Sequence, residues 1–138
     1  MRRIALIVAL HGVVGSVAAV ADTATPVPVS PPPVDAAAIA ALPPIRLSNG
    51  PTVSQYCALR VRRGEVPFGT KFTVGLIVFV SPQGRIADIR IVQPSANARL
   101  DGEAVTCIQR AAKAVVRSEA SAAAGEWQRM KWTWAGDP

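Results

Sequence analysis

The chain has 138 residues and a formal net charge of +6 at pH 7. Without Arg2 and Arg3, 13 of the 15 Lys and Arg residues remain against 9 acids, so the rest of the chain carries +4. This modest charge argues against nucleic acid as a partner, and it bears on solubility and on encounter with anionic membrane surfaces rather than on fold.

The N-terminus has the pattern of an export segment. Met1-Arg2-Arg3 is positively charged, residues 4–20 are apolar or small apart from His11, and Ala19-Val20-Ala21 matches a cleavage site. Residues 1–21 are therefore predicted to be a signal peptide. An uncleaved signal anchor is the alternative, because roughly 18 apolar residues lie at the short end of what crosses a bilayer. In both cases the remainder of the chain is exported.

Residues 22–51 are rich in proline. Proline at this density fixes φ and removes hydrogen-bond donors, so an extended, semi-rigid linker of about 3.1 Å per residue is expected. Asp35 to Leu42 could form a helical turn or two, but that segment is too short to be stable alone. The prolines are Pro26, Pro28, Pro31, Pro32, Pro33, Pro43, Pro44 and Pro51.

The globular domain is predicted over residues 52–138. A first helix is expected from Thr52 or Ser54 to about Arg63, with Val53, Cys57 and Val61 on one face. Lys71 to Ser81 alternates apolar residues on both faces, which predicts a strand that is central and covered on both sides, or that meets a partner on one side.

A hairpin follows this strand. Ser81-Pro82-Gln83-Gly84 is typical of a turn. Polar and apolar residues alternate from Arg85 to Gln93, which predicts a strand with one more polar face. A second helix is expected to start at Asp101, or slightly earlier at residues 95–97, and to run to about Arg117. Its apolar stripe would be Leu100, Ala104, Cys107, Ile108, Ala111 and Val115.

After a small-residue loop at 119–125, residues 126–134 are predicted to form a third strand that carries three tryptophans. These tryptophans suit either cross-strand packing or a ligand groove. The order is α-β-β-α-β. The expected fold class is α+β, with a three-stranded antiparallel sheet and two helices on one face.

Two cysteines, Cys57 and Cys107, lie in the exported part, where a disulfide is permitted. A disulfide between them is expected, and two buried free thiols are the alternative. No metal or other cofactor is expected, because the one histidine, His11, lies in the export segment. Asp88 lies on a predicted strand, apart from Asp101 and Glu103 on the second predicted helix, and no histidine or cysteine base accompanies them, so no enzyme is predicted.

The edges of the predicted sheet differ. The hairpin places Arg85 to Gln93 at one edge, whose charges discourage strand addition. The terminal strand forms the other edge, and an extended peptide could add there as a fourth strand. The residues of this predicted partner-binding edge are Trp127, Arg129, Met130, Lys131, Trp132 and Trp134.

The domain resembles the C-terminal domain of the TonB family. The resemblance is carried by Gln55-Tyr56, by Gly69 to Val80, by the turn and strand at 81–91, and by Leu100-Asp101 with the helix after it. It covers about 80 residues, and the order of export signal, proline-rich linker and domain is similar to the family layout. Cys57 replaces the proline that typically follows the helix-one tyrosine, and a disulfide is more typical of the related TolA C-terminal domain.

The resemblance implies a periplasmic protein-binding domain that contributes to energy transduction or to coupling with an outer-membrane transporter. It also implies that Gln55 and Tyr56 contact the partner. If the N-terminus is uncleaved, His11 would serve membrane coupling to the inner-membrane ExbB and ExbD proteins; otherwise it is a histidine tolerated in a signal peptide. A soluble TonB-like protein, or a structural component of an envelope or secretion assembly without a transduction role, are the alternatives.

Overall fold

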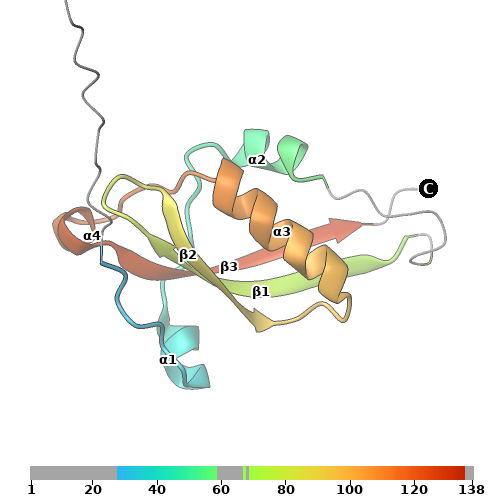
Figure 1. The fold of residues 1–138 in the computed structure, drawn as a ribbon, viewed down its shortest axis with the longest axis horizontal. Helices are drawn as coiled ribbons and strands as arrows, with labels where there is room; N and C mark the ends of the chain where they lie inside the picture. The colour runs from blue at the N-terminus through green and yellow to red at the C-terminus, as the bar shows by residue number, and fades with distance from the viewer. Residues whose placement is uncertain (1–27, 59–66, 68, 136–138) are drawn as a thin grey trace, which may run out of the picture.

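The structure of the protein is a computed structural model, and it describes residues 28–58, 67 and 69–135. The predicted export segment with His11 lies outside these residues. The first predicted helix ends at Tyr56, so the prediction that it runs to about Arg63 is wrong, and residues 59–63 lie outside the described ranges. The described chain forms an α+β domain around one sheet (Figure 1). None of the helices in these described ranges is both long and apolar enough to cross a membrane.

The sheet has three antiparallel strands in the order β2-β1-β3, which confirms the predicted sheet. The strands are β1 (Lys71–Val80), β2 (Ile86–Gln93) and β3 (Glu126–Ala135). The central strand β1 is buried on both faces, as its double apolar pattern predicts. Val74, Leu76 and Val78 face one side, and Ile77 and Phe79 face the other.

Two helices cover the first of these faces: α2 (Gly50–Tyr56) and α3 (Ala98–Ala111) (Figure 1). Leu100, Ala104 and Ile108 recur every fourth residue along α3 and are fully buried, because this spacing places them on one helix face. The disulfide between Cys57 and Cys107 joins the two helices, with 5.7 Å between the Cα atoms. The predicted pairing is therefore confirmed.

The second face of the sheet is covered by a helix that lies within the proline-rich segment. Helix α1 (Ala36–Ala41) begins after Asp35, whose side chain accepts a hydrogen bond from the Ala38 amide. Ile39 and the following Leu42 pack against Ile77, Phe79 and Trp127. Packing of this kind supplies the stability that six residues lack in isolation. The architecture thus has helices on both faces of the sheet.

Helix α2 begins earlier than predicted. Its N-cap is Asn49, rather than Thr52 or Ser54, and Pro51 occupies the first turn, where a missing amide donor has no cost. The Asn49 side chain makes no capping bond. It instead donates to the Ala111 carbonyl oxygen (2.8 Å) and accepts from the Lys113 amide (2.9 Å). These long-range bonds explain why sequence spacing alone placed the start incorrectly.

Helix α3 is capped by Asn97 and ends at Ala111, so the prediction of a helix to about Arg117 is wrong. Residues beyond Ala112 form bonds to other segments: the Ala114 amide donates to Gly84 O and the Val115 amide to Arg46 O, both at 2.8 Å. These bonds replace the helical ladder. Val115 is exposed and does not belong to the apolar stripe.

The predicted loop before β3 contains a short helix, α4 (Glu119–Ala124), capped by Ser118. Gly125 ends it with a φ of 75°. A side chain at this position would also lack space, because a Cβ atom would lie 2.6 Å from Val80 O and 2.8 Å from the Phe79 ring. Glycine is therefore required where the chain enters β3.

Replacing Gly125 with alanine should lower the free energy of unfolding by more than about 1 kcal/mol, because it adds a clash to a disfavoured φ. Gly102→Ala in α3 is the matched control: a Cβ atom there meets open space, and we expect stabilisation of about 0.5–1 kcal/mol. Urea denaturation of both variants measures this. Equal effects of the two changes would contradict the packing at Gly125.

Cys57→Ser should lower the free energy of unfolding by up to about 4 kcal/mol, because the cross-link closes a loop of roughly 50 residues. The double variant Cys57→Ser/Cys107→Ser should be no less stable than the single variant, since one bond is lost in both. Thermal unfolding and a thiol assay on the unreduced, denatured protein test this. Two reactive thiols per chain would rule the disulfide out.

Candidate functional site

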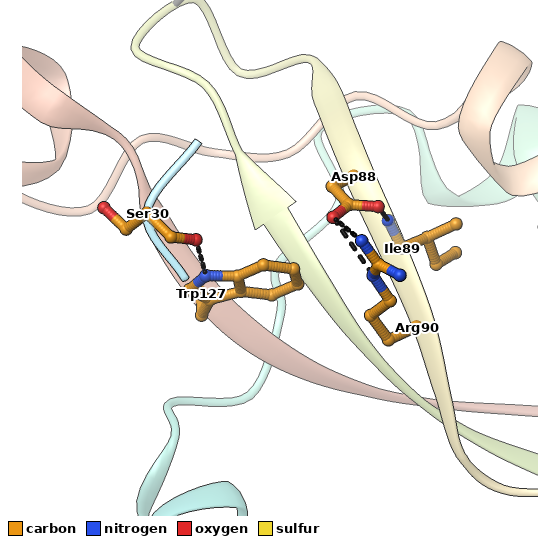
Figure 2. A network of polar contacts seen from close by, with 5 residues as sticks. All are labelled: Ser30, Asp88, Ile89, Arg90 and Trp127. Atoms are coloured by element: carbon orange, nitrogen blue, oxygen red, sulfur yellow. Dashed lines mark hydrogen bonds and ion pairs between the residues drawn. The ribbon is translucent and has the colours of Figure 1, made fainter. Parts of the chain in front are cut away.

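The β2 edge of the sheet is poorly suited to pairing with another strand. Its register with β1 is interrupted twice, at Gly75/Leu76 and at Phe79/Val80. Asp88 Oδ1 also accepts a hydrogen bond from the Ile89 amide at 2.7 Å, while Asp88 Oδ2 pairs with the Arg90 guanidinium at 2.9 Å (Figure 2). Bulges and self-paired charges of this kind protect an edge from strand addition.

The β3 edge carries a short added strand that comes from the same chain. The Arg129 amide donates to Pro43 O and the Ile45 amide donates to Arg129 O, both at 2.9 Å. Pro44 thus bridges to Arg129 in the parallel sense. We call residues 30–47, which include this pairing, the strap. The proline-rich segment therefore already uses part of the edge that was predicted to bind a partner.

Other contacts hold the strap on the sheet. The Trp127 indole N–H donates to Ser30 O at 2.9 Å, as Figure 2 shows, and the Trp127 ring packs edge-on against Phe79. Leu42 packs on the same face, and Leu47 bridges to Ala114 further along. The proline content predicts an extended linker and gives no indication that the segment docks on the sheet. The signal that could have revealed it is the set of apolar residues between the prolines: Ile39, Leu42, Ile45 and Leu47.

Beyond Arg129 the β3 edge is open among the described residues. In an antiparallel strand the amide and carbonyl of one residue point to the same side, and the side alternates along the strand. The β1–β3 register runs without interruption from Lys71↔Ala135 to Val80↔Glu126. The backbone amide and carbonyl groups of Lys131 and Thr133 therefore point away from β1, like those of Arg129. No described residue forms a backbone hydrogen bond with them.

The two margins of this open edge differ in chemistry. On the α2–α3 face, Met130 and Trp134 are buried and Trp132 is partly buried, with Trp134 stacked on Phe72. On the α1 face, Arg129, Lys131 and Thr133 are exposed. Of the two roles considered for the tryptophans, Trp127 and Trp134 serve packing in this structure. The edge presents an apolar margin on one side and a cationic margin on the other.

Gln55 and Tyr56 are found away from this edge. Both are exposed on α2, with Tyr56 at 80%. Tyr56 lines an open groove of about 760 Å³ between α2 and α3, together with Thr106, Cys107 and Arg110. No residue of β3 lines this groove. The structure thus joins Tyr56 to α3 and does not bring it together with the predicted partner-binding strand.

The carboxylates considered for catalysis are likewise dispersed. Asp88 pairs with Arg90 and Glu103 with Arg99. Asp101 is buried, and its Oδ2 accepts from the Ser95 amide at 3.0 Å, which ties the β2–α3 connection to the helix. Within the described ranges, no group of three or more His, Cys, Asp or Glu residues is placed to hold a metal ion.

Amide hydrogen exchange should resolve the strap from the open edge. We expect slow exchange at Met130, which lies in the β1 ladder, intermediate exchange at Arg129, and fast exchange at Lys131 and Thr133. Leu42→Asp removes an apolar anchor of the strap, so it should accelerate Arg129 exchange selectively. Ala37→Asp, at an exposed position of α1, is the control. Uniform exchange along β3 would contradict the proposed division of the edge.

Comparisons with known proteins leave this edge as the main guide to function. No family model, no curated protein and no solved structure matches the chain. The resemblance to TonB C-terminal domains is carried by the sequence features alone.

Proposed function

We propose that this protein is a non-enzymatic, TonB-like binding module of the cell envelope that captures an extended segment of a partner by strand addition to β3. The observation that carries this proposal is the outward orientation of the Lys131 and Thr133 backbone, which no described residue pairs. Main-chain bonds at such an edge provide affinity, while the flanking side chains provide specificity.

The strap supports this proposal because it already pairs with the same edge through an isolated parallel bridge. Pro43 and Ile45 use the Arg129 backbone as a partner would use Lys131 and Thr133. Ile45 packs toward the core on the α2–α3 face, and Pro44 lies on the other face, so the added strand alternates between the two margins. The β2 edge, with its bulges and the Asp88 contacts, offers no comparable site.

The TonB resemblance favours an outer-membrane transporter as partner, with a role in energy transduction or coupling. That role would require an uncleaved N-terminus that engages ExbB and ExbD through the region of His11. A structural component of an envelope or secretion assembly would use the same edge without transduction. N-terminal sequencing of the exported protein separates a transducer from a soluble TonB-like protein, since a chain processed to begin at Asp22 lacks the segment that would engage ExbB and ExbD.

Site-specific photo-crosslinking tests the binding mode in cells. A benzophenone side chain at Thr133 should crosslink an envelope protein through an extended segment, which mass spectrometry can read. The same group at Thr106, in the α2–α3 groove beside Tyr56, is the control position. Crosslinks at Thr106 but not at Thr133 would assign binding to the other groove.

Lys131→Pro should weaken binding of the synthetic peptide read from the crosslink by at least about tenfold, because proline removes one outward donor. The variant should fold, since the Lys131 amide does not belong to the β1 ladder. Glu119→Pro is the matched control, because it places proline at the first position of α4, where no donor is lost. Calorimetry measures affinity and circular dichroism checks the fold. A folded Lys131→Pro variant with unchanged affinity would exclude strand addition.

A further inference from the structure

A hollow of about 590 Å³ lies on the α1 face of the sheet, next to the open part of β3. It crosses one row of the sheet, from Gln93 through Gly75 to Lys131, which are neighbours across the strands. Ala36, Ile39 and Ala40 of α1 line it as well. A Cβ atom on Gly75 would lie 2.9 Å from Gln93 Cβ, so the glycine keeps this row closely packed and without a side chain on this face.

Positive charge lies at this hollow. Arg129 and Lys131 line it, and Lys71 lies on the same face by its position in β1. None of the three makes an ion pair with a described residue. Two acids on this side of the sheet are engaged: Asp88 pairs with Arg90, and Asp35 caps α1. An incoming group on this face therefore meets cations that form no ion pair with another described residue.

We infer that the partner segment captured at β3 is amphipathic and acidic, with carboxylates alternating with apolar side chains. Directly opposed residues on neighbouring strands project to the same face. Residues of an added strand that pair with Lys131 and Thr133 would therefore face the cationic margin, and those between them would face Trp132. This inference rests on the proposed function and specifies the chemistry of the segment that the edge selects.

A second copy of the chain fits this edge less well. Antiparallel pairing of two β3 edges by a two-fold axis would place the Arg129 and Lys131 side chains of one copy among those of the other. Like charges opposed across strands are destabilising. An acidic segment instead supplies a counter-charge, and Gln93 and the hydrogen-bonded Thr73–Thr133 hydroxyl pair provide further polar neighbours on the same face.

Three synthetic octapeptides test the inference by NMR titration of the full exported chain. They alternate valine with glutamate, with glutamine or with lysine. The glutamate peptide should bind at least about tenfold more tightly than the lysine peptide at low salt, with amide shifts at Lys131 and Thr133, and the difference should shrink as salt is added. Lys131→Glu should reduce or reverse this preference.

Lys113→Glu is the matched control, because it makes the same charge change at an exposed residue outside this surface. If Lys113→Glu abolishes the preference as fully as Lys131→Glu, the attraction is non-specific and the inference is overturned. If the glutamine peptide binds as tightly as the glutamate peptide and loses binding in Lys131→Pro, the acidic specificity fails while strand addition stands. Absence of glutamate-peptide binding, or a concentration-dependent dimer that occupies β3 in its place, would also overturn the inference.

Discussion

Burial of both faces of β1 is the constraint on which the rest of the structure depends. A strand with Leu76 and Val78 on one side and Ile77 and Phe79 on the other exposes apolar surface unless two layers cover it. The α2–α3 layer provides one cover. In a domain of this size the remaining chain is short, and the second cover comes from the proline-rich segment, through Ile39 and Leu42. The docking of the strap thus follows from the composition of the central strand.

This constraint also shapes the candidate site. Once the strap packs against Trp127 and Phe79, its continuation passes the β3 edge at Arg129 and satisfies that residue's backbone. It then leaves β3 for the segment after α3, where Arg46 O accepts a hydrogen bond from the Val115 amide and Leu47 bridges to Ala114. The outward groups of Lys131 and Thr133 remain without a described backbone partner. An edge that is closed at one end and open at the other therefore results from the packing of the second face.

Much of the sheet could be predicted because local sequence patterns identify its strands and its turn. The alternation in residues 71–80 and 86–93 and the turn at Pro82 and Gly84 require no distant partner to be recognised. The central place of β1 follows from its double apolar pattern, and the Cys57–Cys107 pair from two inward-facing positions on two helices.

What could not be predicted depends on contacts between remote segments. Asn49 caps no amide of α2 because its side chain bonds to Ala111 and Lys113, more than 60 residues away. The early end of α3 and the extended residues after it depend on Arg46 and Gly84. The docking of the strap on the sheet could not be predicted for the same reason. Its prolines indicate an extended chain, but local rules do not tell whether an extended chain lies free or pairs with an edge.

The order of the contacts along the chain gives the molecule a defined mechanical response. Tension applied from the N-terminal side first loads the bond between Ser30 and Trp127, then the packing of α1, and then the two bonds at Arg129. All of these can yield before α2 is reached. There the covalent link from Cys57 to Cys107 prevents extension of the 50 residues it spans. A pull would therefore detach the strap and lengthen the exposed β3 edge, while the Cys57–Cys107 bond keeps the two helices covalently joined.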